Sequence, residues 1–354
     1  MISMELKERI ESFVLLGNFL NNFLDEKGRS EDSLYKVMED ATEKSGILNP
    51  WFTRESIWQA LHAWVANLKK EQLEKWLEPY ESQLSKNPAR NVAVIMAGNI
   101  PLVGFHDFIT VLLSGNHFTG RLSSGDTELL PALARALVVF NSEWAERITF
   151  TKERLTGFDA VIATGSNNSA HYFNYYFSKV PHVIRKNRNA IAILTGDEDE
   201  RDLAGLADDI FLYYGLGCRN VSKFYFPEGY DVDPLFNVFR RYINYCTHHK
   251  WMNNHDYYRS VFLLNQIPAM DNGFVLLTGN KAIASPPAVL YFEFYHSLDE
   301  LIDQLSLQED EIQVTVCKKE IPLSSCRPGQ AQSPGLSDYA DGIDTMQFLL
   351  DLQK

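Results

Sequence analysis

Asn91-Val-Ala-Val-Ile-Met-Ala97, followed directly by Gly98-Asn99-Ile100-Pro101-Leu102, is the stretch that decides the fold. Its first part is continuously apolar, which is typical of a strand buried on both faces of a parallel sheet. Gly98 and Pro101 then end the strand, because both residue types interrupt regular structure. A helical run over 103–113 follows. A strand, a turn and a helix in this order form the unit from which parallel α/β sheets are built.

Two further copies of this unit come next in the chain. Strands are predicted at 117–122 and near 160–163, and each is followed by a helix, the first over 129–140 and the second rich in Tyr and Phe. The connecting turns are Ser123-Ser124-Gly125-Asp126 and Thr164-Gly165-Ser166-Asn167-Asn168-Ser169. Such turns lie at the carboxyl ends of the strands, where open α/β sheets bind nucleotides. The common dinucleotide fingerprint G-x-G-x-x-G does not occur.

The rest of the chain can be divided into domains by the same patterns of apolar residues and turns. Residues 1–90 have helical spacing of apolar residues, and the second half alternates predicted strands with helices. The further strands are predicted at 190–194, 221–226, 274–277, 289–294 and 312–316, and the helices at 231–245 and 298–305. We therefore predict a helical N-terminal segment (1–90), a nucleotide-binding α/β domain (91–195), a second α/β domain that carries Cys218 (196–325), and a C-terminal loop and helix (326–354).

Cys218 ends the stretch Phe211-Leu-Tyr-Tyr-Gly-Leu-Gly-Cys218 and precedes the predicted strand over 221–226. A turn of small residues that leads into a rigid strand is a good mount for a reactive side chain. The nearby cations Arg219 and Lys223 favour the thiolate over the thiol. A lone cysteine is by itself more often a core residue, so the assignment of Cys218 as a nucleophile depends on the surrounding motifs.

The composition excludes several classes of partner. The chain has 354 residues and a formal net charge of -13, whereas nucleic acids and anionic membranes need a basic surface. No apolar run reaches the roughly 18 residues of a membrane span, and the N-terminus becomes charged at once. The four cysteines are far apart and have no metal-site spacing. We expect a cytoplasmic protein with reduced thiols, no metal, no nucleic-acid partner and no membrane span.

Several histidines are candidate metal ligands or catalytic groups. His248, His249 and His255 lie close to Cys246 but match no helical H-x-x-x-H pair, so a solvated loop is favoured over a metal site. His106 follows the Asn99 turn and is expected to pack on a helix.

Four motifs in this order resemble the aldehyde dehydrogenase superfamily. Asn99-Ile-Pro-Leu102 resembles its P-W-N-F-P-L loop, Gly115-Asn116 with Arg121-Leu-Ser123 its G-N and K-P-S motifs, Thr164-Gly-Ser166 its F-T-G-S motif, and Gly215 with Cys218 its G-Q-x-C motif. The resemblance implies an aldehyde-dehydrogenase-like fold of two parallel-sheet α/β domains. It implies that Cys218 is the nucleophile, that Asn99 and the Cys218 backbone N–H hold the oxyanion, and that Gly165 and Ser166 lie at the cofactor.

The chain departs from those family members that oxidise aldehydes. Such members activate water with a glutamate in an E-L-G-G segment, and the matching segment here is His182-Val-Ile-Arg-Lys-Asn-Arg188. No carboxylate occurs between Asp159 and Asp197. A thiolate attacks a thioester without activated water, so the missing base favours reduction of an acyl thioester. Within the superfamily the chain resembles the LuxC-like acyl-CoA reductases, and the C-terminal stretch 332–342 is also typical of that group.

This resemblance implies that an acyl-CoA or acyl-carrier thioester is reduced to an aldehyde through an acyl-Cys218 intermediate. It also implies a homodimer and leaves an acyl-transferring partner enzyme open. Two alternatives remain. One is an acyl-phosphate or semialdehyde dehydrogenase of the same fold, and the other is a non-catalytic acyl-binding scaffold subunit.

The predicted cofactor residues are Arg121, Ser123, Ser124, Gly165 and Ser166. Arg121 stands where the family usually has a lysine at the adenosine ribose, and Ser124 stands where NAD-preferring members often have a glutamate. A carboxylate binds the ribose 2′-hydroxyl and repels a 2′-phosphate, whereas Arg and Ser can bind that phosphate. The resemblance therefore favours NADPH over NADH, with NADH as the alternative. The glutamate that often precedes F-G-P-V has no counterpart in the matching segment 283–288.

Overall fold

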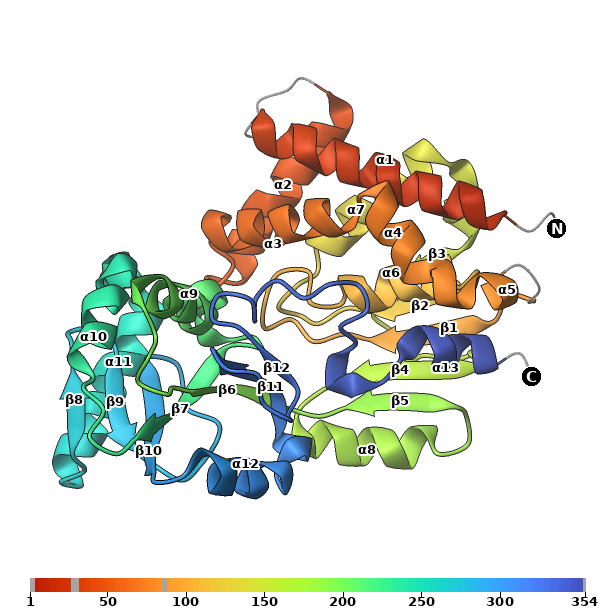
Figure 1. Ribbon diagram of the computed structural model, residues 1–354. Helices are drawn as coiled ribbons and strands as arrows, with labels where there is room; N and C mark the ends of the chain where they lie inside the picture. The colour runs from red at the N-terminus through yellow and green to blue at the C-terminus, as the bar shows by residue number, and fades with distance from the viewer. Residues whose placement is uncertain (1–3, 27–31, 85–87, 353–354) are drawn as a thin grey trace. The chain divides into compact units, whose positions relative to one another are not determined.

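A computed structural model of the protein describes residues 4–26, 32–84 and 88–352, and Figure 1 shows its helices and strands. The chain forms two compact units, Met1–Lys186 together with Gly335–Lys354, and Asn187–Pro334. The first three residues of the charged N-terminal stretch lie outside the described residues. Within the described ranges, no helix has both the length and the apolar character that a membrane crossing requires.

The first unit begins with helices and continues as strands that alternate with helices. Its elements, with 3₁₀ helices labelled η, are α1 (Leu6–Asp25), α2 (Ser33–Leu48), α3 (Arg54–Asn67), α4 (Lys70–Leu77), η1 (Glu78–Tyr80), α5 (Glu81–Leu84), β1 (Asn91–Ile95), α6 (Phe105–Leu113), β2 (His117–Arg121), α7 (Leu129–Phe140), η2 (Ser142–Glu146), β3 (Ile148–Phe150), β4 (Ala160–Thr164), α8 (Asn167–Phe177), β5 (His182–Arg185), η6 (Ala340–Gly342) and α13 (Thr345–Asp351).

The strands of the first unit form one parallel sheet in the order β3-β2-β1-β4-β5. β1 lies at its centre, between β2 and β4. The strands predicted over 91–97, 117–122 and 160–163 are confirmed as β1, β2 and β4. The edge strands β3 and β5 go unpredicted because they have only three and four residues, too few for a periodic pattern.

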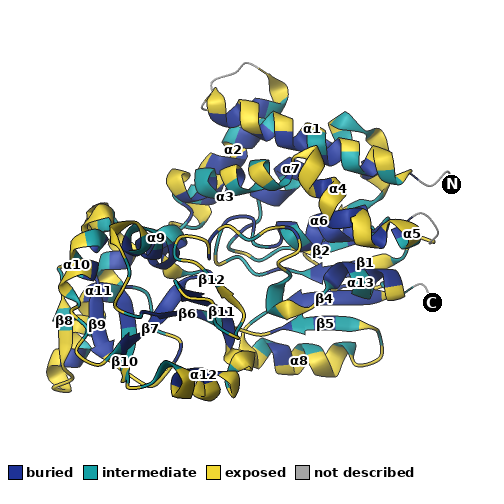
Figure 2. Cartoon of the chain, in the orientation of Figure 1, coloured by how far each residue is buried: buried dark blue, intermediate teal, exposed yellow. Residues whose placement is uncertain are grey.

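The two faces of this sheet are buried in different hydrophobic clusters. Val92 and Val94 belong to a cluster formed with helices α1 to α7, whereas Ala93 belongs to a second cluster that includes Val161 and the ring of Phe173 on α8. Figure 2 shows the resulting burial of the central strands. Successive side chains of a strand point to opposite faces, so the buried positions Val92, Ala93 and Val94 are all apolar. This is why the run in the sequence shows no alternation.

The N-terminal helices share the core of the sheet. Phe13 of α1 makes edge-to-face contacts with Phe108 of α6 and with Trp144, at ring-centroid distances of 6.4 and 5.9 Å. All three side chains are fully buried in one cluster. Such aromatic pairs add about 0.5–1.5 kcal/mol beyond the burial of their area. The predicted helical segment 1–90 is therefore part of the first compact unit.

The C-terminal stretch contributes to both units. The prediction of a single segment over 326–354 is corrected, because the chain passes from the second unit to the first between residues 334 and 335. Arg185 at the end of β5 fixes the returning helix α13. Its Nη1 donates to Asp107 Oδ2 of α6 at 2.7 Å, and its Nη2 donates to Thr345 Oγ1 at 2.8 Å. All three residues are buried, so this cluster ties β5, α6 and α13 together.

The second unit is also α/β. Its elements are β6 (Asn189–Ile193), α9 (Glu200–Phe211), η3 (Leu212–Gly215), β7 (Val221–Pro227), α10 (Asp233–Phe239), η4 (Arg240–Thr247), α11 (His249–Leu264), β8 (Ala269–Asp271), β9 (Leu276–Gly279), β10 (Val289–Tyr295), α12 (Leu298–Ser306), η5 (Glu309–Glu311), β11 (Ile312–Cys317) and β12 (Ser325–Cys326).

These strands form a second sheet in the order β12-β11-β6-β7-β10-β9-β8, which is parallel except for the pair β8 and β9. β6 pairs with β7 and β11, so the predicted strand at 190–194 belongs to this unit. The predicted boundary at 195/196 is therefore corrected to 186/187. A buried parallel strand has the same composition in either sheet, so the sequence around it does not show which sheet it joins.

Two other stretches of the second unit differ from the prediction. The helix predicted over 231–245 is α10 followed by η4, with a kink at Tyr242. The stretch predicted as a solvated histidine loop is mostly α11, and His255 is buried within it. The ring nitrogens of His255 lie 3.1 Å from Asp256 and 2.9 Å from Asp271. His255 therefore serves to join α11 to β8.

Candidate functional site

Three turns of the first unit lie at one edge of its sheet. Asn99 follows β1. Arg121 is the last residue of β2, and Ser123 and Ser124 come after it. Gly165 and Ser166 follow β4. β2, β1 and β4 are adjacent and parallel, so their carboxyl ends meet. α6 and α7 pack on one face of the sheet and α8 on the other. The sheet order β3-β2-β1-β4-β5 changes direction between β1 and β4. Open α/β sheets bind ligands at this kind of switch point.

The turns after β1 and β2 touch each other at backbone distance. A Cβ on Gly98 would lie 2.6 Å from the Cβ of Ser123, and a Cβ on Gly125 would lie 2.7 Å from the carbonyl oxygen of Gly98. Both positions therefore require glycine. This close packing fixes the predicted cofactor residue Ser123 beside the turn that carries Asn99.

Asp126 holds the turn that carries Asn99 through a hydrogen bond to its backbone. Its Oδ2 accepts the backbone N–H of Leu102 at 2.9 Å, and Leu102 has a φ of 58°. A residue with a Cβ holds this left-handed conformation at a cost of about 1 kcal/mol or more. Asp126 is buried, and burial raises its pKa to about 6. Asn99 itself is exposed, on a turn whose backbone is held in one conformation.

The turn after β4 leads directly into α8. Ser166 caps this helix, because its Oγ accepts the N–H of Ser169 at 3.2 Å. A Cβ on Gly165 would lie 2.9 Å from the Cβ of Ser169 and 3.0 Å from the ring of Phe173. Only glycine therefore lets the helix begin so close to the strand. The helix start lies at the same edge as Arg121 and Asn99, and helix N-termini attract phosphate groups.

Cys218 lies in the second unit, in the turn between η3 and β7, and its side chain is exposed. The three consecutive residues Tyr213, Tyr214 and Gly215 have φ values of 55°, 57° and 67°. The left-handed region suits glycine but strains tyrosine by about 1–3 kcal/mol each. Such strain persists only where the surroundings over-determine the backbone, and it concentrates at functional sites.

An aromatic cluster supports this strained stretch. The ring of Tyr214 stacks on the rings of Tyr245 and His248, each at a centroid distance of 4.3 Å. Tyr245 Oη donates to the carbonyl oxygen of Phe211 at 2.6 Å. Trp251 packs edge-on against Tyr245 at 5.1 Å. The first turn of α11 and the end of η4 therefore hold the backbone just before Cys218.

Two buried polar residues that were not predicted as site residues also contact this region. Asn220 Oδ1 accepts the N–H of Gly217 at 2.8 Å. Asp209 of α9 accepts the N–H groups of Gly329 at 2.6 Å and of Ala331 at 2.9 Å. Burial raises the pKa of Asp209 to about 7, and these N–H donors act in the opposite direction. The only sequence signal was an asparagine two residues after Cys218, which is too weak to single out a role.

The cations next to Cys218 in the sequence have partners of their own. Lys223 is fully buried in β7, and its ammonium group binds Glu293 and the carbonyl oxygen of Lys281, the latter at 2.9 Å. Arg219 Nε donates to the carbonyl oxygen of Ala331 at 2.6 Å. The charge of Lys223 is thus compensated within the sheet, and the expectation that it promotes the thiolate gains no support.

The segment in which aldehyde oxidisers have their base contains β5. Arg185 of this segment is buried in its ion pair with Asp107, and no carboxylate occurs in 182–188. In the second unit, Asp209 already accepts two backbone N–H groups and is fully buried. The segment 182–188 therefore offers no carboxylate base, and the carboxylate of Asp209 is not arranged to activate water.

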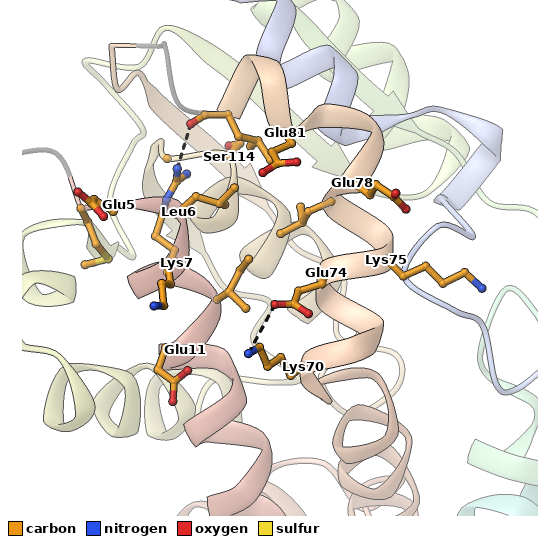
Figure 3. Close-up of a pocket in the computed structure, with 16 residues that line it drawn as sticks. Glu5, Leu6, Lys7, Glu11, Lys70, Glu74, Lys75, Glu78, Glu81 and Ser114 are labelled. Atoms are coloured by element: carbon orange, nitrogen blue, oxygen red, sulfur yellow. Dashed lines mark hydrogen bonds and ion pairs between the residues drawn. The ribbon is translucent and has the colours of Figure 1, made fainter.

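A cavity of about 880 Å³ lies among α1, α4 and α5 of the first unit (Figure 3). Its lining contains none of the predicted site residues, and carboxylates and cations alternate around it. Lys70 and Glu74 pair at 3.7 Å. Arg9 is buried and donates to the carbonyl oxygens of Leu84, at 3.0 Å, and of Leu113. The Arg9 contacts join α1 to α5 and α6, whereas the Lys70–Glu74 pair lies within α4.

The two parallel-sheet units define an aldehyde dehydrogenase fold, as comparison with solved structures shows. An aldehyde dehydrogenase from Physcomitrella patens, in complex with the reaction product succinate, matches with a TM-score of 0.68 at 11% identity, over 99% of this chain and 85% of that chain. The NAD+ complex of an aldehyde dehydrogenase from Bacillus cereus matches with a TM-score of 0.62 at 12% identity, over 90% and 73%. The predicted fold class is confirmed.

The chain belongs to the LuxC acyl-CoA reductase family, whose model matches residues 13–229. It is similar to the long-chain acyl-protein thioester reductase 2 of Photobacterium leiognathi, with 21% identity over 187 residues, and to the long-chain acyl-protein thioester reductase of Aliivibrio fischeri, with 25% identity over 181 residues. These matches cover 49% and 46% of this chain but only 39% and 37% of the relatives. The family predicted from the motifs is confirmed.

Proposed function

We propose that the protein reduces a fatty acyl-CoA or acyl-carrier thioester to the aldehyde through a thioester with Cys218. The observation that carries the proposal is the exposed thiol of Cys218 on a turn that directly follows the strained backbone of Tyr213 and Tyr214 and has many fixed contacts. Membership of the LuxC family supports the reaction class. The names of the curated relatives, long-chain acyl-protein thioester reductases, support a fatty acyl thioester as the substrate.

The reaction has two stages. The Cys218 thiolate attacks the thioester carbon, a new C–S bond forms, and the original C–S bond breaks so that CoA leaves as a thiolate, which takes a proton from solvent. Hydride addition to the acyl carbon then gives an alkoxide, which expels the Cys218 thiolate and releases the aldehyde. The carbonyl oxygen becomes negative in both stages. We assign its stabilisation to the side-chain amide of Asn99 and the backbone N–H of Cys218.

The absence of a base in 182–188 favours aldehyde over acid as the product. Water needs a general base to attack an acyl-enzyme efficiently, and such bases contribute about 10²–10⁴-fold. Without one, the acyl-Cys218 thioester lasts long enough to be reduced. This supports a reductase and disfavours an aldehyde oxidiser.

The hydride is the chemistry that a bound nicotinamide cofactor supplies. The residues present fit such a cofactor, since Arg121, Ser123, Ser124, Gly165 and Ser166 lie at the carboxyl ends of β2 and β4, the two strands that flank β1 in the first sheet. Arg121 and Ser124 are both exposed, and the uncharged Ser124 stands where a carboxylate would repel a ribose 2′-phosphate, which the Arg121 guanidinium can bind. We therefore propose NADPH as the preferred cofactor.

The proposal is tested by following products from fatty acyl-CoA and from the matching acyl phosphate, each with NADPH. We expect CoA and aldehyde in a ratio of one to one, with fatty acid as a minor product. A preference for acyl phosphate would assign the protein to the acyl-phosphate dehydrogenases instead. No turnover of either substrate, with no alkylation of Cys218 by iodoacetamide, would indicate a non-catalytic acyl-binding subunit.

Arg121→Ala is expected to lower kcat/KM for NADPH by about 10- to 100-fold, because a charge-assisted hydrogen bond to the 2′-phosphate contributes about 1.5–3 kcal/mol. The efficiency with NADH, which lacks this phosphate, should stay close to that of the wild type. Steady-state kinetics with both cofactors measure the change. Arg135→Ala, at an exposed position of α7, is the matched control. Equal efficiencies of the unaltered protein with the two cofactors would contradict the assignment of Arg121.

A further inference from the structure

The backbone on both sides of Cys218 is tied to the end of α9 by a single amide. α9 ends at Phe211, and its last carbonyl groups have no partner within the helix. Asn220 Nδ2 lies 3.1 Å from the carbonyl oxygen of Asp209, 3.2 Å from that of Ile210 and 2.8 Å from that of Leu212.

The other end of the same amide faces the cysteine turn. Asn220 Oδ1 accepts the N–H of Gly217 at 2.8 Å, so one side chain spans the turn from residue 217 to residue 220. Asn220 is only 2% exposed. Shortening the side chain therefore removes a buried partner from each of these backbone groups. Asparagine suits the position because its amide presents an acceptor and two donors on a short stem.

A second set of bonds holds the residue on the far side of Cys218. Gln332 Nε2 donates to the carbonyl oxygen of Arg219 at 2.8 Å and lies 3.3 Å from that of Asp209. Arg219 Nε in turn donates to the carbonyl oxygen of Ala331 at 2.6 Å. The backbone is thus fixed immediately before and immediately after Cys218, while the thiol itself is exposed.

We propose that Asn220 is the positioning residue of the nucleophile, which holds the turn of Cys218 in the conformation needed for acyl transfer and is assisted by Gln332. This inference rests on the proposed role of Cys218. The side-chain amides of Asn220 and Gln332 are buried in the second unit and hydrogen-bond to its backbone. They therefore affect the rate of acyl transfer by fixing the backbone of the cysteine turn. A misplaced nucleophile costs rate because near-attack geometry is lost, and displacement by about 1 Å can cost about 10²-fold.

The test compares Asn220→Ala with the wild type in two assays. In the first, the rate of Cys218 acylation by palmitoyl-CoA without cofactor is followed by intact mass over a range of palmitoyl-CoA concentrations. We expect the maximal rate to fall by about 10- to 100-fold, with little change in the half-saturating concentration. In the second, iodoacetamide alkylation is measured at Cys218 and at Cys246, which is the other exposed cysteine and serves as an internal reference. The ratio of the two alkylation rates should change severalfold.

Asn265→Ala is the matched control. Asn265 caps α11, and its exposed Nδ2 donates to the carbonyl oxygen of Val261 at 2.8 Å, so its loss removes an asparagine amide bond at a helix end away from Cys218 in the sequence. It should leave both readouts unchanged. If Asn220→Ala does not fold, Gln332→Ala releases the other side of the turn, and the same two changes are expected with a smaller effect.

The outcomes separate the two proposals. A folded Asn220→Ala that acylates at the wild-type rate overturns the positioning role, as does a rate loss accompanied by equal increases in the alkylation of both cysteines. If the wild type is never acylated but the alkylation ratio changes in Asn220→Ala, the proposed function fails while control of the cysteine turn by Asn220 stands. If the wild type is never acylated and the alkylation ratio does not change in Asn220→Ala, both proposals fail.

Discussion

Cys218→Ala is expected to abolish acylation of the protein. After incubation with palmitoyl-CoA in the absence of cofactor, the wild type should gain the mass of one acyl group, and the variant should gain none. Aldehyde formation should fall by at least about 10³-fold, because removing the nucleophile from such a site removes the step on which all later chemistry depends. Cys218→Ser should behave in the same way, since a hydroxyl is almost fully protonated at neutral pH and forms an ester that is a poorer acyl donor.

The chain provides its own control for this experiment. Cys246 is also exposed, so Cys246→Ala removes a comparably accessible thiol and should leave acylation and aldehyde formation intact. Peptide mapping of the acylated wild type should place the acyl group in the peptide that contains Cys218. Acylation of Cys218→Ala at the wild-type level would show that another side chain accepts the acyl group and would end the proposed mechanism.

Asn99→Ala should give the second-largest loss. Removing one oxyanion-stabilising donor typically lowers kcat by about 10²–10³-fold, and the effect should appear in both acylation and reduction because the carbonyl oxygen becomes negative in each. KM for the acyl thioester should change much less than kcat, since the bond to the oxygen strengthens only in the transition state. Asn99→Asp should be at least as inactive, because a carboxylate repels the oxyanion and has no donor.

A stability measurement separates this effect from damage to the fold. Asn99 is exposed on a turn that is held by Asp126 through the backbone of Leu102, so both variants should unfold at temperatures close to that of the wild type. Asn21→Ala is the control, because Asn21 is exposed on α1 and its side-chain amide bonds within its own helix, to Asp25 at 3.1 Å. A kcat of Asn99→Ala within a fewfold of the wild-type value would remove Asn99 from the mechanism.

The parallel-sheet fold could be predicted because its strands are buried on both faces. β1, β2, β4, β6, β7, β10 and β11 each contain a short run with apolar or β-branched residues, and each lies within a few residues of its predicted position. Most of these runs lie close to Gly, Pro or Asn, whereas β11 lies between Glu311 and Lys318. The edge strands β3, β5, β8 and β12 have two to four residues, which is too short for a periodic pattern. No local pattern marks such a strand.

The histidine stretch shows a second limit. His248 to His255 lacks an apolar period, so a loop was the reasonable prediction, but α11 is held by tertiary contacts of its aromatic and polar residues. Trp251 donates to the carbonyl oxygen of Phe274 at 2.7 Å, and His255 lies between two aspartates. Packing against the rest of the unit here outweighs a weak helical preference.

The sequence by itself determined the fold class, the family, and the order of the Asn99, Arg121, Gly165 and Cys218 turns, because glycine, proline and continuous apolar runs act locally on the backbone. The tertiary structure alone decided that the chain divides at 186/187, that its end returns to the first unit, and that Asn220, Asp209 and Gln332 surround the cysteine turn. The reason is that a buried polar side chain takes its role from partners that folding supplies. Asp209 and Gln332 lie 123 residues apart, and nothing in either local sequence indicates that they meet.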